Sequence, residues 1–333
     1  MNYTITVDWL ELLCSGTIHQ IKFTPDSDKN ITVNEDVVLS KNESKFNPRF
    51  YLSYDILYQG NLLGCLYYKV KPKYRFELED SLILSVENFR LYEKGYSRKL
   101  KLIIEALQIK FIKYNELHIA VDGLDLIKKH NKLVKSNLIK RQRKIKVSTE
   151  FNEQSKINQS YILGSRLSDK YIAIYPKGDF LEKEYKPYIL DFWIQNKLMA
   201  SDGQSIDRVE IRFKKAKLLT DFDSDFSQLE NPAYLASFFK SHGGVYISFT
   251  YKKSKRKVSL IDWCVFKTVD IKKIVKVNHI PVKKSTETAL KTLFLAYRDT
   301  GNKIYFNAAV ELAEYKRLKD KVTKKLPRWL DER

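Results

Sequence analysis

The sequence predicts an α+β fold, in which a large, mainly antiparallel and twisted sheet has helices packed on one face. Short segments of alternating apolar and polar residues, separated by turn residues, predict hairpins. Between them lie segments whose apolar residues recur at helical spacing. The order of strands, a helix and a further strand occurs twice, which suggests two pseudo-repeated halves. A C-terminal helical segment is expected after them.

The first half is expected to begin with a strand at residues 3–13, in which Ile5, Val7 and Trp9 share one face and Asp8 lies on the other. Turn residues at 59–61 and 71–73 then predict tight hairpin connections. The further elements expected here are a loop-rich region at 20–49, strands at 50–58, 62–70 and 74–78, a helix at 97–112, a strand at 117–122 and a helix at 123–135.

The second half is expected to repeat this order and to be followed by a helical end. Two helices at 286–299 and 304–319, joined at Thr300-Gly301-Asn302, predict an αα-hairpin. A boundary near 275–284 is expected to separate a domain of residues 1–275 from a segment of residues 276–333. The other elements expected are strands at 145–150, 159–164, 170–176 and 206–213, helices at 186–199 and 231–240, and strands at 244–251 and 257–268.

The composition predicts a basic protein whose partner is a polyanion. The formal net charge is +20, and the chain contains 21 Tyr and 18 Phe, whose rings can stack on nucleobases. A codon bias toward Lys, Asn, Ile and Tyr would raise both counts as well. The charge therefore favours nucleic-acid binding without establishing it.

The cysteines and the apolar runs indicate the cellular compartment in which the protein is expected. The three cysteines, Cys14, Cys65 and Cys264, are scattered and lack CxxC spacing, which predicts neither a disulfide framework nor a zinc site. The first residues do not show the basic-then-apolar pattern of a signal peptide. No apolar run approaches the ~20 residues that a membrane span needs. We therefore expect no membrane contact and a cytoplasmic, reducing compartment.

Four predicted strands carry core residues on one face and reactive side chains on the other. If these strands are neighbours in one sheet, the reactive side chains gather on a single surface. The alternative is a half-solvated sheet with a merely polar outer face, where Glu and Arg pair across strands. The reactive side chains are Arg75, Glu77 and Glu79 on the first strand, His118 and Asp122 on the second, Tyr175 on the third, and Arg208, Glu210 and Arg212 on the fourth.

Such a set suits transfer of a phosphoryl group to a tyrosine. Carboxylates with an imidazole favour Mg²⁺ or Mn²⁺, and the predicted ligands are Glu77, Asp122, Glu210 and His118. Arginines bind phosphate oxygens bidentately. A tyrosine nucleophile retains the phosphate in a covalent ester, so that a cut strand can be resealed. We predict that Tyr175 is this nucleophile.

Five motif-like segments follow an early strand that contains Val7-Asp8-Trp9-Leu10. They are Arg75-Phe76-Glu77-Leu78, Leu117-His118-Ile119-Ala120-Val121-Asp122, Gly164-Ser165-Arg166-Leu167-Ser168, Ile172-Ala173-Ile174-Tyr175-Pro176-Lys177 and Arg208-Val209-Glu210-Ile211. In this order they resemble the motifs of the Rep_trans family, which comprises rolling-circle plasmid replication initiators of the staphylococcal type and related relaxases of conjugative elements. The resemblance covers roughly residues 3–215.

The resemblance implies a site-specific enzyme that nicks one strand at a replication origin, keeps the 5′ phosphate and frees a 3′-OH. By position the nucleophile is Tyr175, and Arg166 and Arg208 are the catalytic arginines. His118 stands where the family usually has Asp, which leaves its role as a ligand open. Pro176 replaces a residue that is commonly Asn or Asp. Tyr171, four residues back on the same face as Tyr175, is the nearest rival nucleophile.

The implied partners are DNA, as a single-stranded or hairpin origin with flanking duplex, and a helicase from the host or the element. The resemblance places the protein in the bacterial cytoplasm and leaves a homodimer open. Two alternatives stand beside replication. One is a conjugative relaxase that nicks a transfer origin, and the other is a non-enzymatic DNA-binding regulator.

Two basic runs, at 140–146 and 252–257, are candidate phosphate-contacting segments, although solvated loops can have the same composition. The C-terminal helix pair could read duplex DNA near the nick or serve only in packing. The predicted DNA-binding residues are Lys140, Arg141, Arg143, Lys144, Lys177, Arg212, Lys252, Lys253, Lys255 and Arg256.

Overall fold

The computed structural model divides into two compact units, Met1–Val275 and Lys276–Arg333. No helix among the residues that it describes is long and apolar enough to cross a membrane. The described residues are 3–18, 29–74, 81–136, 139–141, 146–152, 155–214, 226–268, 286–300 and 303–315.

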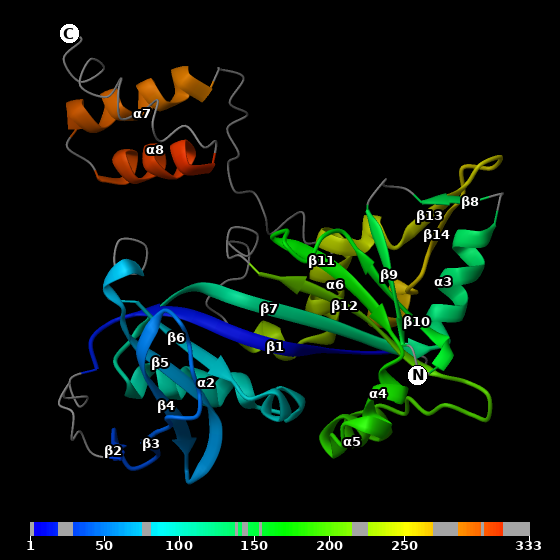
Figure 1. Ribbon diagram of the computed structural model, residues 1–333, viewed down its shortest axis with the longest axis horizontal. Coiled ribbons are helices and arrows are strands. Elements are labelled where there is room, and N and C mark those ends of the chain that lie inside the picture. The colour runs from blue at the N-terminus through cyan, green and yellow to red at the C-terminus, as the bar shows by residue number, and fades with distance from the viewer. Residues whose placement is uncertain are drawn as a thin grey trace. The chain divides into compact units, whose positions relative to one another are not determined.

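The first unit is built on an antiparallel sheet of eleven described strands, shown in Figure 1. Two meanders, β2 to β6 and β9 to β12, flank the two long central strands β1 and β7. In spatial order the strands are β2 (Asn30–Thr32), β3 (Val37–Lys41), β4 (Phe50–Tyr58), β5 (Asn61–Val70), β6 (Ser81–Val86), β1 (Tyr3–Ser15), β7 (Lys110–Leu124), β12 (Ile206–Phe213), β11 (Lys170–Tyr175), β10 (Ser155–Leu163) and β9 (Val147–Asn152). The predicted antiparallel α+β class is confirmed.

Three helices pack on one face of this sheet: α2 (Tyr96–Ala106), α3 (Leu126–Lys135) and α6 (Pro232–Gly243). Their apolar side chains share the main core with the inward residues of β7, β11 and β12. This face was expected from the alternation of the strands. The core residues that meet there include Leu100, Leu126 and Phe238 from the helices and Val121, Ile172, Ile174, Val209 and Ile211 from the strands.

The other face is covered at one end by α4 (Lys177–Lys183) and α5 (Pro187–Gln195), together with the 3-10 turn η2 (Asn88–Tyr92). Leu181, Ile189 and Trp193 form a small separate core there with Leu124 and Ile206. The prediction that helices pack on one face therefore holds for α2, α3 and α6. It is incomplete for α5, which closes the end of the opposite face.

Several predicted boundaries are wrong in informative ways. The helix expected at 97–112 ends at Ala106, because Gln108 adopts a left-handed φ of 53° and β7 starts at Lys110. Phe111 fits the helical period, yet it lies in the strand. The region expected to be loop-rich at 20–49 contains β2 and β3 in its described part.

The strand expected at 74–78 is not observed in its described part. Tyr74 ends the 3-10 turn η1 (Pro72–Tyr74), and 75–80 lie outside the described residues. The next strand seen is β6, which starts at Ser81 and pairs with β1 and β5.

The strands expected at 244–251 and 257–268 are shorter and leave the main sheet. They form a three-stranded sheet in the order β14 (Lys257–Ser259), β13 (Ser248–Tyr251) and β8 (Ile139–Arg141). The remaining parts of the two predicted strands include the 3-10 turns η5 (Gly244–Tyr246) and η6 (Trp263–Phe266), and a further turn, η4 (Phe226–Glu230), precedes α6.

The second unit contains the predicted pair of helices, α7 (Thr286–Thr300) and α8 (Lys303–Tyr315). The rings of Phe294 and Phe306 meet edge to face at 5.9 Å, and Leu290 and Ala309 are buried between the helices. The predicted αα-hairpin is confirmed.

Replacing Gly64 should destabilise the sheet beside β1, because β5 and β6 approach closely there. A Cβ at this residue would lie 2.2 Å from the carbonyl oxygen of Ser85. We expect Gly64→Ala to lower the free energy of unfolding by about 1–3 kcal/mol, measured by urea denaturation. The control is Gly244→Ala, where φ is −53° and the nearest atom lies 3.5 Å away on the Lys240 side chain. Equal free energies of unfolding for the two variants would contradict the close approach of β5 to β6 at Gly64.

Candidate active site

The register of three neighbouring strands gathers the predicted reactive side chains on one face of the sheet. Strands β7, β12 and β11 pair so that directly opposed residues form rows across the sheet. Residues in one row share a face because opposed positions of an antiparallel pair point the same way. The rows are Asp122, Arg208 and Tyr175, then Ala120, Glu210 and Ala173, then His118, Arg212 and Tyr171.

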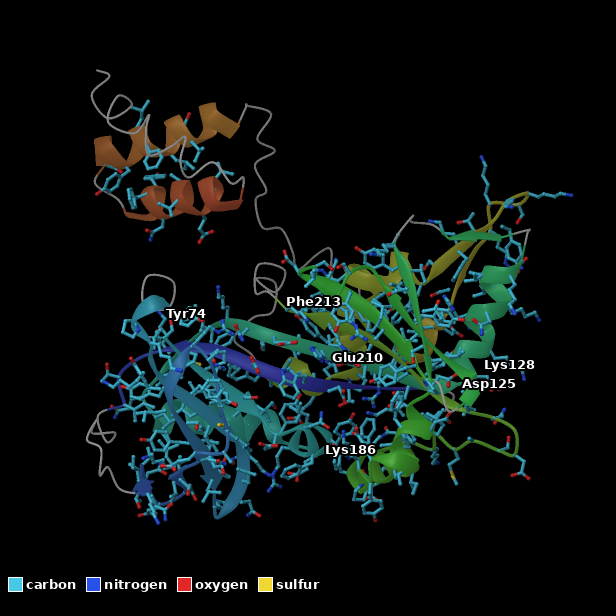
Figure 2. All side chains as sticks on the ribbon, in the orientation of Figure 1. Tyr74, Asp125, Lys128, Lys186, Glu210 and Phe213 are labelled. Atoms are coloured by element: carbon cyan, nitrogen blue, oxygen red, sulfur yellow. The ribbon has the colours of Figure 1, made fainter. Side chains whose placement is uncertain are left out.

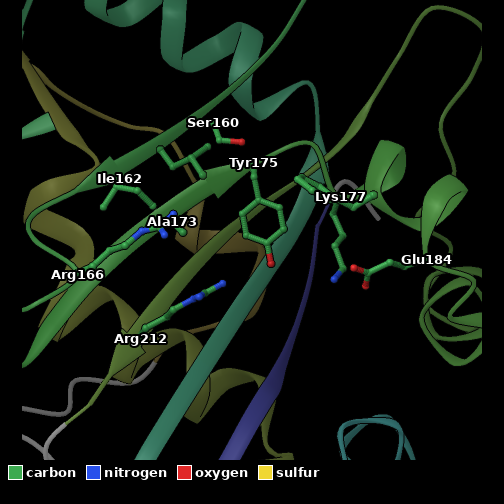
Figure 3. Close-up of a pocket in the computed structure, with 10 residues that line it drawn as sticks. Ser160, Ile162, Arg166, Ala173, Tyr175, Lys177, Glu184 and Arg212 are labelled. Carbon is green, nitrogen blue, oxygen red and sulfur yellow. The ribbon is translucent and has the colours of Figure 1, made fainter. Parts of the chain in front are cut away.

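Tyr175 lies in a pocket on this face with a volume of about 230 Å³. Its ring lies between Arg212 and Lys177, and Lys177 and Glu184 point toward each other (Figure 3). The third basic residue of the lining is Arg166, from the turn between β10 and β11. An anion that enters this pocket therefore meets several positive charges beside a phenol.

The Tyr175 hydroxyl donates a hydrogen bond to Oε2 of Glu210, at 2.8 Å. Figure 2 marks Glu210 in the middle of the larger unit. The same oxygen accepts from Nη2 of Arg212, at 2.9 Å. Nδ1 of His118 lies 2.9 Å from the other carboxylate oxygen. Ala120 and Ala173 flank Glu210 in its row, so small side chains leave room for this cluster.

These contacts fix the charges of the cluster. Burial raises the pKa of Glu210, but the hydrogen bond from His118 and the charges of His118 and Arg212 outweigh it and hold that pKa below its usual range. Burial lowers the pKa of His118, and its hydrogen bonds to Glu116 and Glu210 overcome this and raise it. The Nε2 atom of His118 lies 2.8 Å from Oε1 of Glu116. An anionic Glu210 is thus held against a basic imidazole.

The same environment keeps the phenol protonated in the free protein. Burial and the nearby negative charge of Glu210 raise the pKa of Tyr175 well above its usual value. Removal of the phenolic proton therefore has to accompany any reaction of this oxygen, and Glu210 is the acceptor already in contact with it.

Arg208 lies next to the pocket in a buried ion-pair network. It is fully buried, and its Nε and Nη2 bond to the two oxygens of Asp122 at 2.6 and 2.8 Å. Nη1 bonds to Asp8 at 2.6 Å, and Nη2 lies 3.0 Å from the Tyr92 hydroxyl. Trp193 donates from its indole to Asp122, at 2.7 Å. Arg208, predicted to be catalytic, is thus engaged by three neighbours, Asp122, Asp8 and Tyr92, and does not line the pocket.

A bulge in β1 brings Asp8 into this network. The pairing of β1 with β7 shifts between Val7 and Trp9, so Asp8 turns toward Arg208 and the alternation inverts beyond it. Leu10 then lies in the core, whereas Trp9 is 37% exposed beside His118. The prediction that Trp9 shares one face of the strand with Ile5 and Val7 is therefore wrong.

Asp8 is ionised in this position. Burial raises the pKa of its carboxyl, but the charges of Arg208 and Lys177 outweigh it and hold that pKa well below its usual range. Tyr92 also donates a hydrogen bond to Asp8. The bulge thus supplies the second carboxylate that compensates the buried guanidinium.

The four predicted metal ligands are only partly brought together. Glu210 and His118 are in contact, Asp122 is bonded to Arg208 and Trp193, and Glu77 lies outside the described residues. Within the described ranges, no three His, Cys, Asp or Glu side chains converge as metal ligands do. The described residues alone therefore supply no complete set of ligands for Mg²⁺ or Mn²⁺, and the metal stays a prediction.

The predicted DNA-binding residues fall in two places. Lys177 and Arg212 line the pocket. Lys140 and Arg141 lie in β8, which pairs with β13. The run at 252–257 is exposed and connects β13 to β14, whereas Arg143 and Lys144 lie outside the described residues.

Four residues of the site were not predicted from the sequence. Glu116 lies two residues before His118 on the same strand, so alternation could have indicated it. Asp8 was expected on the non-core face without a partner. Tyr92 and Trp193 come from η2 and α5, and no spacing in the sequence connects either of them to Arg208.

No protein-family model matches the chain, and no curated protein matches it either. Among solved structures, the chain is similar to the rolling circle replication initiator protein from Geobacillus stearothermophilus, with 14% sequence identity and a TM-score of 0.40. The likeness covers 82% of this chain and 96% of the initiator. At this TM-score the likeness assigns no function, so any proposal has to rest on the site.

Arg208→Met should destabilise the protein strongly. It leaves two buried carboxylates, Asp8 and Asp122, without their cation, which we expect to lower the free energy of unfolding by about 3–5 kcal/mol at pH 7. The deficit should shrink as the pH falls toward 5, because burial raises the pKa of Asp8 once the Arg208 charge no longer lowers it, and its carboxyl then takes up a proton. Denaturant unfolding at both pH values measures it.

Arg212→Met is the matched control, since Arg212 lies two residues along the same face and its side chain is 31% exposed. Arg212→Met should lower the free energy of unfolding clearly less than Arg208→Met does. A loss at Arg208 no greater than that at Arg212 would contradict the role given to the buried network.

Proposed function

We propose that this protein is a site-specific DNA nicking–closing enzyme that initiates rolling-circle replication through a covalent bond between Tyr175 and a 5′ phosphate. The observation that carries the proposal is the Tyr175 hydroxyl bonded to Glu210 in the wall of a basic pocket. A tyrosine that served only packing would not need a buried anion and several cations around its oxygen.

The pocket has the charge that a phosphodiester needs. Arg212 and Lys177 lie on opposite sides of the Tyr175 ring, and Arg166 adds a third cation to the lining. Fixed cations neutralise the charge that develops on the phosphate oxygens as the phosphorus is attacked. Arg208 would act as a positioning residue in this scheme, since its nitrogens already bond to Asp8 and Asp122.

In the proposed step, Oη of Tyr175 attacks the phosphorus and the bond from phosphorus to the 3′ oxygen breaks. The phenolic proton passes to Glu210 as the new bond forms. The departing 3′ oxygen takes up a proton from water to become a 3′-OH, and Glu210 then returns its proton to the solvent, so that the protons balance. Attack of a 3′-OH on the phosphotyrosine reverses the step and reseals the strand. A bound Mg²⁺ or Mn²⁺ would add polarisation of the scissile phosphate.

Flanking DNA would contact the small sheet. Pairing of β8 with β13 brings Lys140 opposite Thr250, next to the exposed turn that carries Lys252, Lys253, Lys255 and Arg256. Strand pairing thus joins β8, which holds Lys140 and Arg141, to the strand that leads into this exposed turn, so segments more than 100 residues apart in the sequence share one sheet surface. We propose that this surface contacts phosphates of the origin DNA. A helicase would then unwind that DNA.

Tyr175→Phe should abolish nicking while leaving DNA binding intact. Without the phenolic oxygen no ester can form, so we expect a loss of more than about 10³-fold. The measurement is conversion of supercoiled plasmid to the open circle, with Mg²⁺ or Mn²⁺ and a plasmid carrying the DNA around the protein's own gene.

Tyr171→Phe is the matched control, because its hydroxyl contacts Arg212 at 3.2 Å and lies on the same face. It should retain activity within about tenfold. If Tyr175→Phe nicks as well as wild type, Tyr175 is not the nucleophile. If the wild-type protein binds DNA but does not nick it, the alternative of a non-enzymatic regulator is favoured.

Nicking should decline as the pH rises through about 8. Burial and the charge of Arg208 lower the pKa of Lys177 to about 8, so its ammonium is present below that pH and lost above it. In Lys177→Arg the guanidinium stays protonated, and the decline between pH 7 and 9 should disappear. Single-turnover nicking rates measure this, and the same decline in both proteins would exclude Lys177 as its cause.

A further inference from the structure

The exposed indole of Trp9 lies on the face of the sheet that carries the pocket. The bulge at Asp8 directs it there, opposite His118 in the pairing of β1 with β7. His118 in turn is opposite Arg212, which lines the pocket. The two other described tryptophans, Trp193 and Trp263, are buried.

A carboxylate and an imidazole lie beside this indole. The Glu11 carboxylate lies near the Trp9 side chain. Glu11 accepts a hydrogen bond from Nδ2 of Asn115, at 2.7 Å. The Trp9 and His118 rings lie 6.2 Å apart at 31°. A large apolar ring beside His118 thus keeps more than a third of its surface in solvent.

The charges around Trp9 favour a base over a phosphate. Glu11 and Glu116 bring negative charge close to the indole, which repels phosphate, whereas a neutral base can stack on an aromatic ring. The cations that suit phosphate lie further along the row, at Arg212. Trp9 on β1 and Arg212 on β12 have only β7 between them, so their backbones lie about 10 Å apart. A strand held at Arg212 can therefore place a neighbouring base against Trp9.

We propose that Trp9 is a stacking platform for one unpaired nucleobase beside the scissile phosphate, so that the enzyme takes its cut strand in single-stranded form at that nucleotide. This inference rests on the proposed function. It adds a base contact to a site whose other proposed contacts with DNA are charge contacts.

The test measures coupling between the ring and a base. In a Tyr175→Phe background, which cannot cut, single-stranded oligonucleotides spanning the nick site each carry one abasic position, and fluorescence anisotropy gives Kd. We expect one abasic position to weaken binding about tenfold. With Trp9→Leu added, which keeps the apolar bulk, that penalty should vanish because base and ring act as one contact.

Further variants separate stacking from folding. Trp9→Phe should keep part of the penalty, since a smaller ring still stacks. The control Tyr51→Ala removes an exposed aromatic residue from β4, outside the rows of the site, and should keep the full penalty. An unchanged penalty in Trp9→Leu would overturn the inference. Failure of the Tyr175→Phe protein to bind any of the oligonucleotides would instead contradict the proposed function.

Discussion

The buried guanidinium of Arg208 is the interaction on which the rest of the site depends. A cation removed from water is tolerated only where carboxylates and hydrogen-bond acceptors surround it closely. Asp122 on β7 and Asp8 in the bulge of β1 provide the charge, and Tyr92 on η2 provides the further contact. Asp122 also accepts from Trp193 on α5. One side chain thus ties two central strands to the elements that close the end of the sheet.

The position of the nucleophile follows from this constraint. Tyr175 lies opposite Arg208 in the pairing of β11 with β12, so fixing β12 also fixes the row from which the phenol projects. Glu210, two residues further along β12, then meets the hydroxyl. Its anionic state depends on His118 and Arg212, which come from the next row. The buried network around Arg208 thus positions Tyr175, and His118 and Arg212 in the neighbouring row keep Glu210 anionic.

Alternation along each strand was enough to predict which residues share a face. Tyr171, Ala173 and Tyr175 do lie opposite to Ile172 and Ile174, as their spacing indicates. The pairing of β7 with β12 could not be predicted, because it joins segments more than 80 residues apart and many registers satisfy the same pattern.

Local irregularities limited the prediction elsewhere. The bulge at Asp8 inverts the alternation of β1 and moves Trp9 to the site face, and a period-2 pattern contains no sign of it. Phe111 satisfied both the helical and the strand period, so only the left-handed turn at Gln108 separates α2 from β7. The contacts of Tyr92 and Trp193 with the site depend on tertiary packing alone.

The most direct test of the account is to identify the atom that becomes bonded to DNA. An oligonucleotide with a sulfur in place of the bridging 3′ oxygen at the nick site releases a thiol that reseals poorly, so the covalent complex accumulates. Proteolysis and mass spectrometry of that complex should locate a 5′-phosphonucleotide on Tyr175. An adduct on Tyr171 or on any other residue would contradict the account.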